Sequence, residues 1–223
     1  MTSRPRPIRT RKLPEQRRAE IVETAAHIAL EEGLELITLR RVAEEMGVRP
    51  GLISHYFPAA DNLVSEAFTH ATTRERDSLL PPHEQDLPPV ERLARFLVGL
   101  ADGDYLDLSR LWLNARHLSR FKDSLRHAVR TQESETRAAL VALVDRGVRA
   151  GEFTTDDALR ATLHILIAVD GLGAYANDDS PPQDPDLSDV AIETAESRLG
   201  LASGTLRARA GTRGTPPPHG SAG

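Results

Sequence analysis

Helical periodicity is the feature that most limits the folds open to this chain of 223 residues. From Pro14 onward, apolar residues recur at intervals of three and four, first as Ile21, Ala25 and Ile28, which places them on one face of an α-helix. No segment shows the strict apolar–polar alternation that predicts a half-buried strand. We therefore predict an all-α fold, with helices near 14–32, 39–46, 50–56, 61–79, 89–101, 104–119, 122–149, 155–176 and 187–200.

Proline- and glycine-rich stretches divide these helices into regions. Four prolines lie within 79–89, and we interpret this stretch as a link between two domains. The arginine-rich start, 1–13, has no apolar periodicity and is predicted to be a flexible arm. The predicted organisation is this arm, an N-terminal helical domain over 14–74, a C-terminal helical domain over 85–201 and a disordered tail over 202–223.

Composition and charge exclude several classes of protein. The chain has no cysteine, so it has no disulfide scaffold and no cysteine-bound metal. No apolar stretch approaches the ~20 residues of a membrane span and no signal sequence is evident, so we expect a soluble cytoplasmic protein without membrane contact. The first 18 residues carry seven basic side chains and one glutamate, whereas the whole chain has a net charge of −5. A basic end on an acidic body suggests either contact with a polyanion or a solubilising tail.

The segment 38–57, TLRRVAEEMGVRPGLISHYF, is the most specific signal in the chain. Two short helices meet at Gly47, small Ala43 allows them to approach closely, and Val48 and Ile53 fill the angle between them. This is the pattern of a helix-turn-helix, whose second helix enters the major groove of DNA. An ordinary three-helix corner is the simpler alternative. The candidate DNA-contacting residues are Thr38, Arg40, Arg49, Pro50, Gly51, Ser54, His55 and Tyr56.

The stretch RRAEIVETAAHIALEEGLELITLRRVAEEMGVRPGLISHYFPAADNLVSEAF resembles the DNA-binding domain of the TetR family of one-component bacterial regulators. The match covers about 15–74. GLISHYF, together with the later GVRAGEF and VDGLGAYA, looks most like the betaine-regulator (BetI-like) branch of that family. The sequence departs from the family where many relatives have Tyr in place of Ser54 and Lys in place of Ala60, two positions that commonly serve phosphates.

The resemblance implies a homodimer that binds a DNA operator and is released by a small molecule, with repression as the default. It places the dimer contact on the last two helices. There the candidates are Leu159, Leu163, Leu166, Ile167, Val190 and Thr194, although part of this apolar surface belongs to the monomer core. A ligand pocket is expected between the helices. Its candidates are Tyr105, Trp112, Arg116, His117, Phe121, His164 and Asp170, with Trp112, Arg116 and His164 predicted to share a wall.

Two other kinds of function remain open at this point. An enzyme is disfavoured because the chain has no phosphate-cradling glycine motif, no thiol and no HExxH zinc motif; we expect no catalytic residue, metal or cofactor. A helical protein-interaction module without DNA binding would use the same fold. A gel shift with DNA from upstream of the gene distinguishes that module from a repressor, and a turnover screen tests for an enzyme.

The basic arm generates a prediction of its own. If it enters the minor groove beside the operator, deleting residues 1–13 will lower DNA affinity. It will also flatten the dependence of log affinity on log salt by about one unit per lost phosphate contact. An unchanged slope in a salt titration would show that the arm does not touch DNA.

Overall fold

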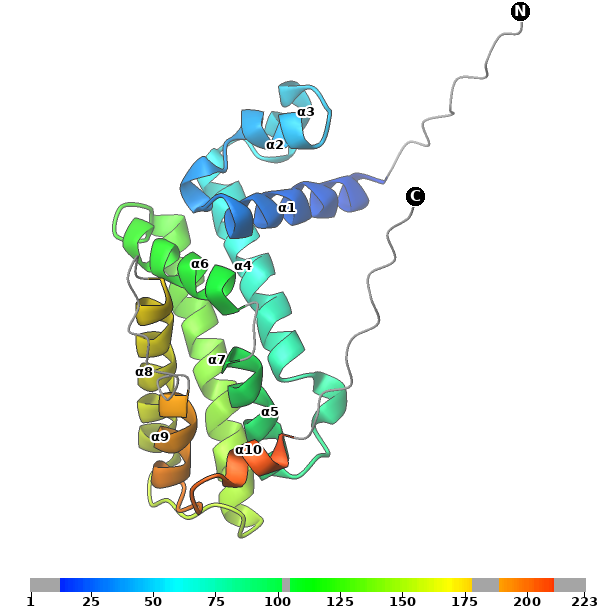
Figure 1. The fold of residues 1–223 in the computed structure, drawn as a ribbon. Helices are drawn as coiled ribbons and strands as arrows, with labels where there is room; N and C mark the ends of the chain where they lie inside the picture. The colour runs from blue at the N-terminus through cyan, green and yellow to red at the C-terminus, as the bar shows by residue number, and fades with distance from the viewer. Residues whose placement is uncertain (1–12, 102–104, 178–188, 211–223) are drawn as a thin grey trace, which may run out of the picture.

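The computed structural model describes residues 13–101, 105–177 and 189–210 (Figure 1). Within these ranges the chain forms α-helices and two short 3-10 helices but no strand, so the all-α prediction is confirmed. The elements are α1 (Pro14–Glu31), η1 (Leu34–Leu36), α2 (Leu39–Glu45), α3 (Pro50–Tyr56), α4 (Ala60–Leu79), η2 (Pro82–Glu84), α5 (Pro89–Ala101), α6 (Tyr105–Leu118), α7 (Asp123–Arg149), α8 (Ala158–Ala176), α9 (Val190–Arg198) and α10 (Thr205–Arg209).

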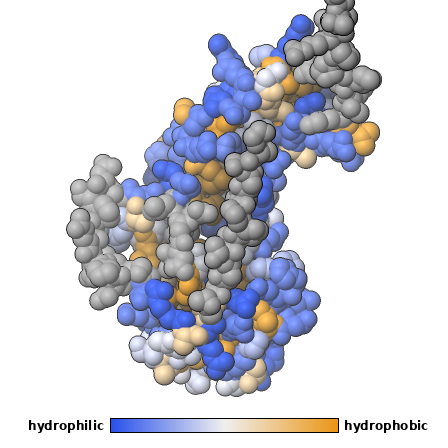
Figure 2. All heavy atoms as spheres, turned by 45° about the vertical axis from the view of Figure 1, so that its right-hand side comes forward, coloured by the Kyte–Doolittle hydropathy of each residue, from blue (hydrophilic) through white to orange (hydrophobic). Residues whose placement is uncertain are grey.

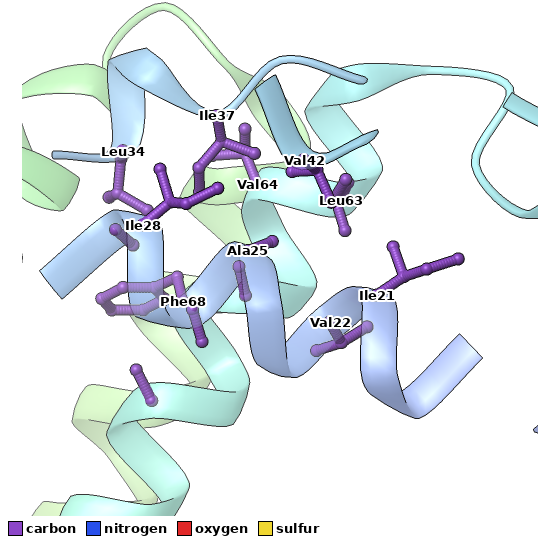
Figure 3. Close-up of a cluster of buried hydrophobic side chains, with 14 of the residues drawn as sticks. Ile21, Val22, Ala25, Ile28, Leu34, Ile37, Val42, Leu63, Val64 and Phe68 are labelled. Atoms are coloured by element: carbon purple, nitrogen blue, oxygen red, sulfur yellow. The ribbon is translucent and has the colours of Figure 1, made fainter. Parts of the chain in front are cut away.

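Helices α1 to α3 form a cluster at one end of the molecule, and α4 leads from it along the larger bundle of α5 to α10 (Figure 1). Pro14 occupies the first turn of α1, where its missing N–H costs no hydrogen bond. Gly33, with φ +111°, ends that helix in a backbone conformation that favours glycine. The buried face of α1 packs against Phe68 and its neighbours on α4, as Figure 3 shows for Ile28 and Ala25.

The N-terminal core does not stop at the predicted link. Leu111 and Ala115 of α6 and Leu125 and Val129 of α7 belong to the same buried cluster as α1 to α4. Polar contacts reinforce the junction, since the Leu34 N–H donates to the side-chain oxygen of Asn114 at 3.1 Å. The cluster of α1 to α3 therefore packs directly against α6 and α7, in addition to its connection through α4.

A second buried cluster holds the lower part of the bundle together. It joins α5, the second half of α7, α8, α9 and α10, with Leu93, Leu140 and Ile165 among its buried side chains. The GVRAGEF segment, 147–153, connects these elements. Gly147 leaves room for the ring of Phe153, Gly151 turns with φ +72°, and the Glu152 carboxylate accepts the Val90 N–H at 2.8 Å. The motif is thus explained by packing between α5 and α7.

The prediction of a disordered tail from residue 202 is wrong for its first part. Residues 205–209 form α10, and Leu206 is fully buried in the second core. The buried carboxylate of Glu196 accepts the Gly204 N–H at 2.9 Å and the Leu206 N–H at 2.8 Å, which satisfies the start of α10. The glycines and arginines of this stretch are typical of a disordered tail, but a single buried leucine, Leu206, is enough to anchor it. Residues 1–12 and 211–223, on which the arm and the rest of the tail fall, lie outside the described residues.

Helix α8 is unusually apolar for its degree of burial. It is the one described helix long and apolar enough, by length and composition, to cross a membrane, yet only 28% of that window is buried. Length and apolar composition alone do not identify a membrane span, because the core helix of a soluble protein can have both. Leu159, Leu163 and Ile167, spaced by four residues, form an exposed stripe along it. By contrast, the side of the molecule on which α4 lies is mostly hydrophilic (Figure 2).

The fit between Gly147 and Phe153 can be tested. A Cβ at residue 147 would lie 2.0 Å from a carbon of the Phe153 ring, so Gly147→Ala should destabilise the fold by about 1–3 kcal/mol. Thermal unfolding should show a Tm lower by roughly 2–4 °C per kcal/mol. Gly51→Ala is the matched control, because a Cβ there meets nothing within 4 Å. Equal melting temperatures for the two variants would contradict this packing.

Candidate nucleic-acid interface and ligand cavity

The turn between α2 and α3 has the geometry that the sequence predicted. Gly47 adopts φ +61°, which lets the chain reverse, and the Val48 N–H donates to the carbonyl of Ala43 at 2.9 Å. Ala43 and Ile53 are fully buried between the helices. Thr38 caps α2, its hydroxyl accepting the Arg41 N–H at 3.0 Å. The segment 38–57 is a helix-turn-helix in structure as well as in pattern.

The outer face of α3 is open to solvent. Gly51, Ser54 and His55 are exposed, while Ile53 on the opposite face holds the helix in the core. Tyr56 is half-buried and its ring meets that of His55 edge to face, with centroids 5.3 Å apart. The Ser54 hydroxyl donates to the carbonyl of Pro50 at 3.1 Å. Pro50, in the first turn of α3, is also exposed. Most of the exposed side chains of this short helix are therefore small.

Some arginines around this surface hold helices together through ion pairs, whereas others are exposed and able to contact an anion. Arg41 pairs with Glu32 and with Glu45, and therefore ties α2 to the end of α1. Arg40 is 82% exposed and pairs with Glu44 at 2.8 Å, a contact that solvent screens. Arg49, just before α3, is exposed and has no ion-pair partner among the described residues. Arg40 and Arg49 are thus two exposed cations beside α3 that the described chain can offer to an anion.

A cavity of about 260 Å³ lies in the bundle below this end. Helices α4 to α8 all contribute to its wall, so elements far apart in the sequence form this partly open cavity. Trp112, Arg116 and Asp170, three of the predicted ligand residues, line it together. Its apolar lining includes Leu79, Phe96, Leu100, Leu163, Leu166 and Ile167.

Arg116 organises one side of the cavity. Its guanidinium donates to Glu133 at 2.9 Å and to Asp170 at 2.9 Å, and it lies 5.5 Å from the centroid of the Trp112 ring. The Trp112 ring in turn packs edge to face on Phe68, at 5.0 Å. Asp170 therefore has the partner that an acid within an apolar helix requires. One guanidinium joins α6, α7 and α8.

Glu75 of α4 also lines the cavity and contacts Trp112. The Trp112 indole N–H donates to its carboxylate at 3.2 Å. Burial raises the pKa of Glu75 to about 7, although the Trp112 hydrogen bond and the charge of Arg76 act in the other direction. The group therefore changes charge near neutral pH. Sequence reasoning missed Glu75 and Glu133; for Glu75 a signal existed, because it follows Phe68 and Ala71 on the apolar face of α4.

The other predicted ligand residues lie elsewhere. His164 lines a separate cleft with Asp157, Arg160 and Ser197, because its position on α8 points it towards α9. The prediction that it shares a wall with Trp112 is therefore wrong. His117 is exposed and packs edge to face on Phe121, which is 73% exposed, so neither residue lines the cavity. The side chain of Tyr105 lies outside the described residues.

Most of the predicted dimer residues lie on the surface of α8 and α9, and Leu166 is the exception. Leu159, Leu163 and Ile167 form the exposed stripe of α8, with Ile167 67% exposed. On α9, Val190 is exposed and Thr194 is half-buried. Leu166 instead lies half-buried in the cavity wall, one residue away from the stripe. Leu163 and Ile167 belong to both surfaces, since each also lines the cavity.

Family models match both parts of the chain. Residues 21–67 match "Bacterial regulatory proteins, tetR family", and residues 86–177 match "Tetracyclin repressor-like, C-terminal domain". A curated relative, the HTH-type transcriptional regulator PksA of Bacillus subtilis, is 25% identical over 164 residues, which cover 73% of this chain and 79% of PksA.

Solved structures share the fold. A TetR transcription regulator from Haloarcula marismortui superposes with a TM-score of 0.68 at 24% identity, over 83% of this chain and 97% of that one. A transcriptional regulator from Saccharomonospora viridis in complex with choline gives a TM-score of 0.66 at 20% identity, over 82% and 95% of the two chains. At these sequence identities the structural similarity shows a shared fold and does not show a shared function.

The environment of Glu75 gives a pH prediction. A folded-state pKa raised to about 7 means that the group contributes stability below its unfolded value, near 4.5, and that this stability is lost as the pH rises through 7. Glu75→Gln should therefore melt like the parent near pH 4.5 and above it at pH 8, by about 3 kcal/mol or roughly 6–12 °C. Thermal unfolding of both proteins from pH 4.5 to 8 measures this. Parallel melting curves across the range would show that Glu75 does not titrate there.

Proposed function

We propose that this chain, which belongs to the TetR family of bacterial transcriptional regulators, is a homodimeric repressor that binds a palindromic operator and leaves it when a small molecule binds. The observation that carries the proposal is the outer face of α3. Gly51, Ser54 and His55 are exposed there on a helix that Ile53 anchors firmly in the core. The family's members are regulators and not enzymes, which confirms the prediction that this chain is no enzyme.

In this proposal residues 14–74 bind DNA, with α3 inserted in the major groove. Gly51 allows the backbone to approach the duplex, and Ser54, His55 and Tyr56 reach phosphates or base edges. Arg40 and Arg49 contact phosphates, as the basic arm does, and compensate for Ser54 and Ala60 at positions where many relatives carry Tyr and Lys. Thr38 holds α2 in place through its cap.

The exposed stripe on α8 supports dimerisation through residues 85–201. Leu159, Leu163 and Ile167 present an apolar ridge that a second copy buries by two-fold symmetry, together with Val190 and Thr194 of α9. The dimer then holds two α3 helices at a separation of about 34–36 Å or a multiple of it, which fits successive major grooves. Two half-sites explain why an operator would be palindromic.

The effector binds in the cavity beside Trp112. Glu75, Arg76 and Leu79 of α4 line that cavity, and the first half of α4 is part of the core that seats α1 to α3. A ligand that prefers a different position of α4 therefore changes the spacing of the two α3 helices, and a coupling of a few kcal/mol is enough to switch occupancy.

The chemistry of the cavity bears on the proposed BetI-like branch. The choline-bound neighbour shows that a chain of this fold holds a small quaternary ammonium. Here Trp112 and Phe96 are the aromatic residues of the described cavity lining, and Arg116 already covers the Trp112 ring. A complete aromatic cage is not assembled among the described residues, so choline binding requires Arg116 to move. We also propose a cytoplasmic location, as expected for a regulator that binds DNA.

A gel shift with DNA from upstream of the gene tests the proposal. Gly51→Asp puts bulk and negative charge against phosphate, so it should weaken operator binding at least about tenfold. It should leave the dimer intact, because a Cβ at this position meets nothing in the protein. Light scattering measures the mass of each protein, and fluorescence anisotropy measures the affinity.

Gly51→Ala provides the graded control. It adds one methyl group without charge and should raise helix stability by roughly 0.5–1 kcal/mol. Its loss of affinity should lie between those of the parent and the aspartate variant. If Gly51→Asp binds the operator as tightly as the parent, α3 is not the DNA-reading helix; a monomeric parent would refute the two-fold arrangement.

A further inference from the structure

Two arginines lie without a matching charge on the face of the bundle away from α8. Arg92 of α5 is 9% exposed, and its Nε is buried without a hydrogen-bond partner among the described residues. Its one side-chain hydrogen bond among the described residues is long, 3.4 Å from Nη2 to the carbonyl of Pro81. Arg146 of α7 faces the same cleft, and no carboxylate of the described residues lies within 4 Å of either guanidinium. A buried guanidinium left unpaired is costly, so its presence needs an explanation.

The neighbouring charged groups are already engaged or distant. Arg76 also lines the cleft, but it donates to Gln132 at 2.9 Å and to Glu135 at 2.8 Å. Glu84 is paired with Arg95 at 2.6 Å. Asp77 is the one acid in the cleft lining, and it is exposed and pairs with neither arginine. Burial and then repulsion from Arg146 lower the pKa of Arg92, while Glu84 raises it slightly. The local field therefore favours an anion.

The cleft has both the volume and the lining for a small molecule. It holds about 300 Å³ between α4, α5 and α7. Leu80, Pro82, Ala142 and Leu143 supply an apolar wall beside the two guanidiniums. Two arginines match the two oxygens of a carboxylate, and the apolar wall matches a short hydrocarbon chain. This cleft is distinct from the Trp112 cavity but adjoins it, since Arg76 of α4 lines both.

We propose that the cleft around Arg92 and Arg146 is a second ligand site, which takes an organic anion consisting of a carboxylate and a short apolar chain. The carboxylate accepts hydrogen bonds from the guanidiniums of Arg92 and Arg146, and the chain lies against Leu143 and Leu80. Because Arg76 and Asp77 of α4 line the site, an anion held there stiffens the same helix that contributes Glu75, Arg76 and Leu79 to the effector cavity.

Thermal unfolding and titration calorimetry of the full chain test the site, with hexanoate as the probe at constant ionic strength. Hexanoate should raise the Tm in a saturable manner. Inorganic phosphate should do so at least tenfold more weakly because it lacks the chain, and hexylammonium should not do so at all. If phosphate is as effective as hexanoate, the apolar part of the proposal is wrong; if no titration saturates, there is no site.

Variants locate the binding. Arg146→Ala should weaken hexanoate at least tenfold, whereas Arg137→Ala should not; Arg137 is on the same helix but lines the Trp112 cavity. Arg92→Met removes the unpaired guanidinium and keeps the apolar volume, so without ligand it should melt at or above the parent while losing the hexanoate response. Retained binding in Arg146→Ala, or equal loss in Arg137→Ala, would overturn the assignment.

Discussion

The packing of Trp112 against α4 is the contact on which the rest of the structure depends. Its ring meets Phe68 edge to face in the N-terminal core, and its indole N–H binds Glu75 two turns further along the same helix. One side chain of α6 therefore fixes both halves of α4. Because the cluster of α1 to α3 is also seated on α6 and α7, the orientation of α3 is set by the bundle and not by a flexible joint. In the proposed mechanism, a change in the cavity therefore reaches the proposed DNA-binding face through α4 and α6.

Buried charges in this chain have distinct uses that follow from their partners. Glu196 is satisfied by two backbone N–H groups and anchors α10, so its role is structural. Arg116 is satisfied by two carboxylates from different helices and holds the cavity wall. Glu75 has a single hydrogen bond, from a neutral donor, and the Nε of Arg92 has no hydrogen-bond partner among the described residues. Glu75 and Arg92 both line open space, which is where a ligand would complete their contacts.

Periodicity and turn residues were enough to predict the helices and the helix-turn-helix, because Gly47, Ala43 and Ile53 act through local geometry. The cavity was predicted only in part. Trp112 and Arg116 lie one turn apart on α6, so their common face could be inferred, but the positions of His164 and Phe121 depend on how distant helices cross. The ion pair of Arg116 with Asp170 joins residues 54 apart in the sequence, and no local pattern encodes it. Likewise, α10 was missed because Leu206 is its sole large apolar anchor, and its cap comes from Glu196.

Helix α8 places a constraint on any mechanism that uses both a dimer and a ligand. Leu163 and Ile167 line the cavity and also stand in the exposed stripe, so the wall of the ligand site and the proposed dimer surface share side chains. A molecule that displaces these residues necessarily alters the surface offered to a second copy. Conversely, a partner that covers the stripe closes one side of the cavity. In the proposed repressor, ligand affinity and dimer geometry are therefore linked through α8, while α4 carries the response to the DNA-binding face.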